Sequence, residues 1–225
     1  MYMEELIQIV REDYLDDVAD TDDDSDLRWS DSFLRRALAK AEREACRRTD
    51  LLFDDSTSTV TQITLATDTD SYTYNNKITR IDSVIYDDEP LDQKTEAELV
   101  EEHGEGWRTD TGEPTAYVVR GGKIRFYPTP TSSESGDIVY LEVFRLPLVP
   151  FTTSPEIPEE HHEDLCPYAA YLAWKRRDED TFDPGKASEM LAEFTATFGT
   201  LDDAAIRRHR LEQPKNTQIK SPRYF

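Results

Sequence analysis

Two adjacent histidines lie among five carboxylates in the stretch SPEIPEEHHEDL, residues 154–165. Imidazole and carboxylate groups are common zinc ligands, and they also serve as general acids and bases. One hypothesis is therefore a metal-dependent hydrolase that uses His161, His162 and the nearby carboxylates. On a helix, however, adjacent side chains point about 100° apart, so this pair cannot share one metal ion as an i, i+4 pair can.

The same stretch has the features of a helix N-terminus. Pro158 falls in the first turn, and Glu159 and Glu160 lie near the positive end of the helix dipole. His161 precedes Leu165 by four residues, which places its ring beside the expected apolar stripe. The pattern favours a packed histidine at the start of a helix, with the hydrolase kept as the alternative.

Other motifs that carry chemistry are missing from the sequence. It contains no nucleophile elbow, Walker motif or zincin motif. The acidic segment 20–26 lacks the ligand spacing and the turn glycine of a calcium-binding EF-hand loop, so a cation there is an open question. We therefore predict no catalytic residue, no metal site and no cofactor, and we expect the protein not to be an enzyme.

The overall charge restricts the class of partner. The chain has 225 residues and a formal net charge of −22, which would repel the phosphate backbone of nucleic acid. Its cations are mostly arginine and its anions include many aspartates, a surface that suits a salty medium. A halophilic origin is a hypothesis, and an ordinary acidic protein is the alternative.

The cysteines and the hydropathy indicate a reducing compartment and no membrane. Cys46 and Cys166 both fall in helix-like segments, without the spacing of a disulfide framework. No apolar run approaches the roughly 18 residues needed to span a bilayer. The first ten residues lack the basic region and cleavage site of a signal peptide.

Helical patterns occupy both ends of the chain. The spacing predicts helices over about 3–18 and 30–50, and again over 158–180 and 183–213, where Gly199 could introduce a kink. The second helix shows an apolar stripe that includes Leu34, Leu38 and Ala41. We assign its opposite, solvent-facing side to Arg35, Arg36, Lys40, Glu42 and Arg43.

The central part of the chain has the period-two pattern of strands. We expect strands at about 59–66, 70–75, 78–86 and 137–146, and a short helix from 95 to 103. Residues 115–130 predict a hairpin whose two-residue turn is Gly121–Gly122. The fold class is thus α+β. A helical bundle (1–52 and 155–213) would carry an inserted antiparallel β-sandwich or small barrel (53–154) and an extended C-terminal arm (214–225).

The C-terminal arm differs from the rest of the chain. Its segment KNTQIKSPRYF contains three cations and no acid, and it ends in two aromatic residues of the kind that anchor interfaces. An extended arm can add a strand to a partner's sheet or lie in its groove, whereas a frayed terminus is the alternative. The residues expected to bind a partner are Ile219, Pro222, Arg223, Tyr224 and Phe225.

Four phrases occur in a characteristic order, namely LRRALAKAEREACRR, ITLATDTDSYTY, KIRFYPTP and PEIPEEHHEDLCPYAAYLAW. Together they resemble the head–tail connector proteins, also called adaptor or head-completion proteins, of tailed viruses. The resemblance covers about residues 1–200. It implies a helical bundle with a β module, and a structural virion protein in a ring beneath the portal, usually of twelve copies.

The resemblance also implies a location and partners. The protein would be made in the host cytoplasm and would lie at the neck of the virion, where the arm docks on the portal protein and another face contacts the tail or the next connector protein. DNA would pass through the channel of the ring without sequence-specific binding. A tail-terminator or tail-tube component is a further alternative. Arginines that could oppose acidic neighbours between subunits are Arg35, Arg36, Arg207, Arg208 and Arg210.

Overall fold

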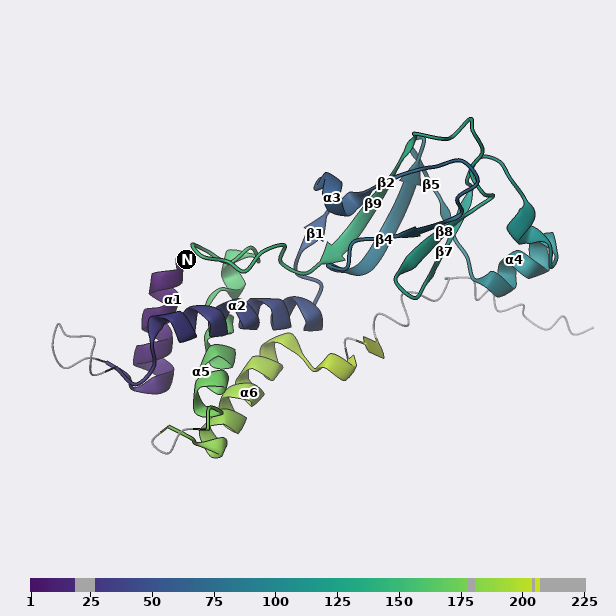
Figure 1. The fold of residues 1–225 in the computed structure, drawn as a ribbon. Helices are drawn as coiled ribbons and strands as arrows, with labels where there is room; N and C mark the ends of the chain where they lie inside the picture. Colours follow the sequence, from purple (N-terminus) through teal and green to yellow (C-terminus); the bar gives the residue numbers. More distant parts are fainter. Residues whose placement is uncertain (19–26, 178–180, 204, 207–225) are drawn as a thin grey trace, which may run out of the picture. The chain divides into compact units, whose positions relative to one another are not determined.

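The computed structural model describes residues 1–18, 27–177, 181–203, 205 and 206, and these form two compact units (Figure 1). The helical unit comprises Met1–Asp54, Lys77–Ile81 and Val143–Ala205. The strand unit comprises Asp55–Asn76 and Asp82–Glu142, together with Ile206. None of the described helices is long and apolar enough to cross a membrane.

The N-terminal part of the helical unit confirms the predicted helices. Helix α1 (Met3–Ile9) continues into a wider π-helical segment, Val10–Leu15, which ends at Asp16 in the left-handed region with φ 48°. Helix α2 (Asp31–Arg48) buries the predicted apolar stripe. Glu42, however, is 0% exposed, so its assignment to the solvent-facing side was wrong.

The C-terminal helices are shorter than the periodicity predicts. Two single 3-10 turns, Glu159–His161 and Glu163–Leu165, precede helix α5 (Cys166–Trp174). Helix α6 (Pro184–Phe198) begins where the Asp183 carboxylate accepts backbone N–H bonds from Gly185 and Lys186. It ends at Gly199, whose φ of 71° breaks the helix rather than kinking it.

The core of the helical unit is formed by α1, α2, α5 and α6. Trp29 and Trp174 meet edge to face at 5.1 Å, and Phe194 and Phe198 are also buried. Burial raises the pKa of the Cys46 thiol to about 12 and raises that of Cys166 as well. Both cysteines are free and buried, and because their thiols stay protonated they pack as apolar core groups.

The strands form two sheets. The first has the order β1 (Phe53–Asp54), β9 (Ile138–Arg145), β4 (Ile78–Tyr86) and β5 (Glu89–Pro90), with β2 (Gln62–Thr64) also paired to β9. The second has the order β3 (Ser71–Thr73), β8 (Lys123–Tyr127), β7 (Ala116–Arg120) and β6 (Asp92–Gln93). The described strands close no barrel, so that alternative was wrong, whereas the sandwich stays a prediction.

Local details of the strand unit confirm some predictions and correct others. Gly121 and Gly122 take φ values of 60° and 76° between β7 and β8, as the predicted two-residue turn requires. Residues 58–61 form a short helix, α3 (Ser58–Thr61), where a strand was expected. The pair β6–β7 is parallel, so the sheets are not purely antiparallel.

The predicted short helix is confirmed as α4 (Glu96–His103). Thr95 and Glu98 form the expected capping box, in which each side chain bonds to the other residue's backbone N–H. A single 3-10 turn, Trp107–Thr109, follows it. Leu99 and Trp107 are buried against residues of β7 and β8 in a small second core.

Candidate interaction surfaces

The two adjacent histidines do not converge on a common ligand. His162 is 5% exposed, and its Nε2 donates a hydrogen bond of 2.9 Å to the carbonyl oxygen of Ile157. His161 is half-buried, and its Nδ1 lies 3.1 Å from Asp164 Oδ2 while its ring contacts Phe198. Each imidazole therefore has its own structural neighbours, and together they secure the entry into α5.

Among the described residues, no group of three or more His, Cys, Asp or Glu side chains could hold a metal ion. The acidic segment 20–26, which the sequence left open as a cation site, lies outside the described residues.

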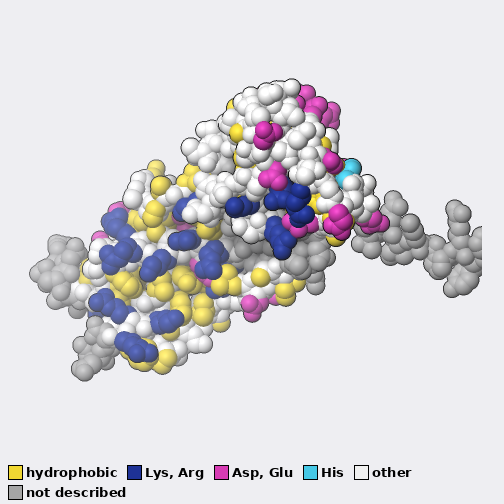
Figure 2. Space-filling model, turned by 45° about the vertical axis from the view of Figure 1, so that its right-hand side comes forward, with side chains coloured by type: hydrophobic (Ala, Val, Ile, Leu, Met, Phe, Trp, Pro, Cys, Tyr) yellow, Lys and Arg dark blue, Asp and Glu magenta, His cyan; other side chains and the backbone are white. Residues whose placement is uncertain are grey.

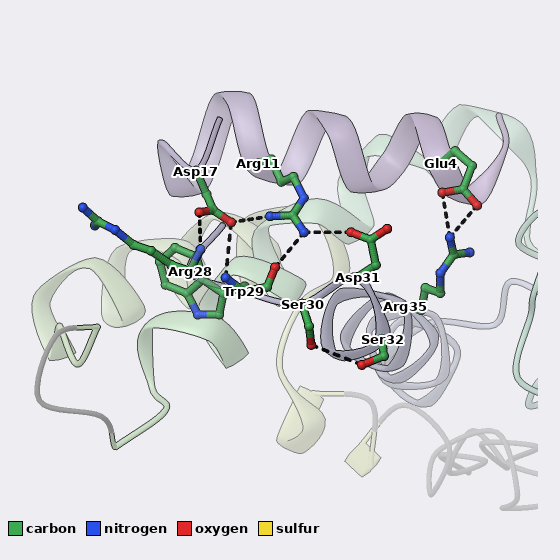
Figure 3. A network of polar contacts seen from close by, with 9 residues as sticks. All are labelled: Glu4, Arg11, Asp17, Arg28, Trp29, Ser30, Asp31, Ser32 and Arg35. Carbon is green, nitrogen blue, oxygen red and sulfur yellow. Dashed lines mark hydrogen bonds and ion pairs between the residues drawn. The ribbon is translucent and has the colours of Figure 1, made fainter. Parts of the chain in front are cut away.

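A second cluster of charged groups joins the start of the chain to α2 (Figure 3). The Arg11 guanidinium pairs with the buried carboxylate of Asp17, and its Nη2 donates to Trp29 O at 2.6 Å and to Asp31 Oδ1 at 2.7 Å. Asp17 Oδ1 also accepts the backbone N–H of Arg28 at 2.7 Å. The Arg11 guanidinium and the buried Asp17 carboxylate thus find their partners within the chain, so this cluster stabilises the fold.

A third cluster lies where α2 meets the segment before α5. Arg145 donates to Asp54 at 2.5 Å and to Glu156 at 2.6 Å. The Glu42 carboxylate accepts the backbone N–H of Glu156 at 2.5 Å, and burial raises the pKa of Glu42 to about 7. These contacts explain why Glu42 faces inward.

Exposed cations gather elsewhere on the helical unit. A groove of about 240 Å³ lies between α2 and the end of α5, and we call it the basic groove. It is lined by Phe33, Arg36, Ala37, Lys40, Leu172, Lys175 and Arg176. Figure 2 shows Lys and Arg side chains gathered among hydrophobic ones on one face of the molecule. Arginine and aromatic residues, both present in this lining, are enriched at protein–protein interfaces.

The strand unit carries a surface of opposite charge. A hollow of about 510 Å³, which we call the acidic hollow, is lined by Tyr86, Asp87, Asp88, Gly136, Asp137, Ile138 and Tyr140. The Tyr86 hydroxyl donates to Asp137 Oδ2 at 2.9 Å, and burial together with this carboxylate raises the pKa of the phenol, so it stays neutral. Asp87 and Asp88 are exposed and take φ values of 51° and 62°.

The sequence composition of the two units repeats this contrast. Residues 55–76 and 82–142 contain 18 Asp and Glu side chains against five Lys and Arg. The described residues of the helical unit contain 21 acids against 15 cations. The strand unit is therefore the more acidic of the two for its size.

The predicted partner-binding residues fall into three groups. Arg35 bonds both carboxylate oxygens of Glu4, at 2.6 and 2.7 Å, so its charge is used within the chain. Arg36 is exposed and lines the basic groove. The remaining residues lie outside the described part of the chain, namely Arg207, Arg208, Arg210, Ile219, Pro222, Arg223, Tyr224 and Phe225.

Sequence reasoning missed parts of both surfaces. Lys175 and Arg176 directly follow helix α5, whereas the periodicity predicts a longer helix that includes them. They line the same groove as Arg36 only through tertiary packing. The acidic hollow is lined by both Asp87 and Asp137, which are 50 positions apart in the sequence. The one available signal was the i, i+4 spacing of Arg36 and Lys40.

Comparison with known families gives one result that covers both units. A family model described as SU10 adaptor protein matches residues 1–218. No curated protein matches the chain.

Proposed function

Because the chain belongs to the SU10 adaptor protein family, whose members are structural proteins of the phage head–tail junction, we propose that it forms a ring that docks on the portal and links it to the tail. The observation that carries this proposal is the extent of the match, since residues 1–218 include both units. The resemblance to phage adaptors expected from the sequence is thereby confirmed.

The contacts of the charged residues support a binding role rather than a chemical one. The buried arginines Arg11 and Arg145 are paired with carboxylates inside the chain, and His162 is tied to a backbone carbonyl. The basic groove and the acidic hollow, in contrast, lie open to solvent. Such an arrangement leaves its charges available to other proteins of the virion.

The proposed ring contains twelve copies around a DNA channel. With a net charge of −22 for each chain, the ring would carry a strongly negative potential. Duplex DNA would be repelled from the wall and would pass without adhering. In this proposal the helical bundle of residues 1–52 and 155–213 is the scaffold of the ring, and the β domain of residues 53–154 faces a neighbouring subunit or the tail.

The arm of residues 214–225 is the proposed contact with the portal. It combines three cations with Tyr224 and Phe225 in a chain that is otherwise acidic. The family match ends at residue 218, so the residues from Ile219 onward extend beyond the matched part.

Deletion of residues 214–225 tests this role. We expect the shortened chain to keep the melting temperature of the full chain and to lose binding to the purified portal protein. A narrower variant, Tyr224→Ala with Phe225→Ala, keeps the cations of the arm and should weaken binding at least about tenfold, because aromatic anchors dominate interface energies. Unchanged portal binding by the deletion variant would falsify the role of the arm.

A further inference from the structure

We propose that the basic groove of one copy binds the acidic hollow of a second copy, and that this contact joins neighbours in the ring. The inference rests on the proposed function because it names the surfaces through which that ring assembles. The two surfaces differ, so the contact is head to tail. Contacts of this kind close into rings when the rotation between copies permits.

The basic groove has the charge and the shape of a docking site. Arg36 and Lys40 lie one turn apart on α2, so their side chains project from the same face. Lys175 and Arg176 line the same groove from the end of α5. None of the described residues that line the groove is a carboxylate, and no ion pair is seen within the described chain for Arg36, Lys40 or Arg176.

Apolar side chains lie between these cations. Phe33 and Leu172 are half-buried in the groove, and the Arg176 guanidinium lies 5.6 Å from the centre of the Phe33 ring. A partner that fits this groove must bring carboxylates together with an aromatic or aliphatic surface, because the floor and the rim would otherwise be left without complementary groups.

The acidic hollow supplies that combination. Three of its residues are aspartates, and none of its described lining residues is a cation. Tyr140 and Ile138 line it as well, with 44% and 37% of their surfaces exposed. Tyrosine is among the residues that most often anchor interfaces, and it packs well against arginine.

Charge favours a second copy over nucleic acid as the occupant. A chain with a net charge of −22 repels a polyphosphate, whereas the acidic hollow belongs to the same polypeptide and is present at the same concentration as the groove. The duplex backbone presents mainly phosphates, and it offers Phe33 and Leu172 only the small apolar surface of its sugars. The complementary charges would align the two copies and raise their rate of association.

Charge exchange between the two surfaces tests the proposal on the full chain. The groove variant is Arg36→Glu with Lys40→Glu, and the hollow variant is Asp87→Lys with Asp88→Lys. Light scattering at about 0.15 M salt measures the oligomer that we expect the unaltered chain to form. Each variant alone should associate at least about tenfold more weakly than the unaltered chain. A 1:1 mixture of the two variants should recover the oligomer, because every contact is then again between opposite charges.

A second hollow variant is needed because Asp87 and Asp88 have left-handed backbone conformations, in which lysine is strained. Asp87→Asn with Asp88→Asn tolerates positive φ, and it should also weaken assembly while it keeps the melting temperature. The matched control for the groove variant is Arg28→Glu with Lys123→Glu, which makes that variant's charge change at exposed positions that line neither surface. This control should assemble as the unaltered chain does.

The outcomes separate this inference from the proposed function. If the unaltered chain forms rings and the groove and hollow variants form them equally well, the inference is wrong and the adaptor ring stands. If the unaltered chain forms no oligomer at any concentration tested, the ring itself is contradicted. If the unaltered chain binds a 30-base-pair duplex and the groove variant does not, the basic groove is a nucleic-acid site and the proposal is overturned.

Discussion

Arg11 and Arg36 lie in the same helical unit, yet their surroundings differ. Arg11 is 8% exposed and is surrounded by Asp17, Asp31 and the carbonyl oxygen of Trp29. Arg36 is exposed in a groove that no described carboxylate lines. Residue type alone therefore says little about the role of an arginine. The two arginines differ in whether a carboxylate of the described chain pairs with the guanidinium.

The largest effect is expected from removing the buried arginine, Arg11. Arg11→Met should lower the free energy of unfolding by about 3–5 kcal/mol, because the buried carboxylate of Asp17 is left without its cation. Urea denaturation followed by circular dichroism measures the change. The control Arg35→Met removes an ion pair with the exposed Glu4 and should cost less than about 1 kcal/mol. Equal costs for the two variants would contradict the distinction.

The second prediction concerns the buried carboxylate of Glu42. Burial raises its pKa from 4.5 to about 7, so between these pH values the folded chain keeps a proton that the unfolded chain releases. Glu42 therefore favours folding most below pH 4.5, and this contribution is lost as the pH rises to 7. The free energy of unfolding, relative to that of Glu42→Gln, should fall by roughly 2–3 kcal/mol over this range.

Paired denaturation curves of both proteins at pH 4.5, 5.5, 6.5 and 7.5 measure this difference and cancel the titration of the other acids. A difference that stays constant over the range, or that grows with pH, would show that the Glu42 carboxylate is ionised in the folded chain.

The third and smallest effect concerns salt and the exposed charges. Lowering the salt from molar to tens of millimolar should lower the melting temperature of the groove variant by a few degrees, because repulsion among surface carboxylates is less screened. This variant isolates the monomer. Association of the unaltered chain should change in the opposite direction and tighten. If the melting temperature of the groove variant stays constant or rises as the salt concentration is lowered, this result would count against the hypothesis of halophilic adaptation.

Local sequence signals were sufficient where neighbours along the chain decide the structure. The apolar stripe of α2, the Thr95–Glu98 capping box and the Gly121–Gly122 turn all depend on residues a few positions apart. The signal that ends α6, Gly199, is also local. We expected this glycine to introduce a kink, whereas its positive φ terminates the helix.

Local sequence signals failed where contacts between residues far apart in the sequence decide the structure. Glu42 has a polar side chain at a position that the helical period leaves ambiguous. Its carboxylate is held inward by the backbone N–H of Glu156, which is distant in the sequence. The strand expected at 59–66 begins as a helix, in which the Thr61 hydroxyl bonds to Thr57 O at 3.0 Å, so β propensity was overridden locally. The acidic hollow and the basic groove require tertiary contacts that no spacing encodes.

Electron microscopy of the purified chain bound to its portal protein tests the central claim most directly. The account predicts a closed ring, twelve-fold in our proposal, seated on the portal and surrounding an open channel. A chain that stays monomeric on the portal, or a ring found at the far end of the tail, would contradict it.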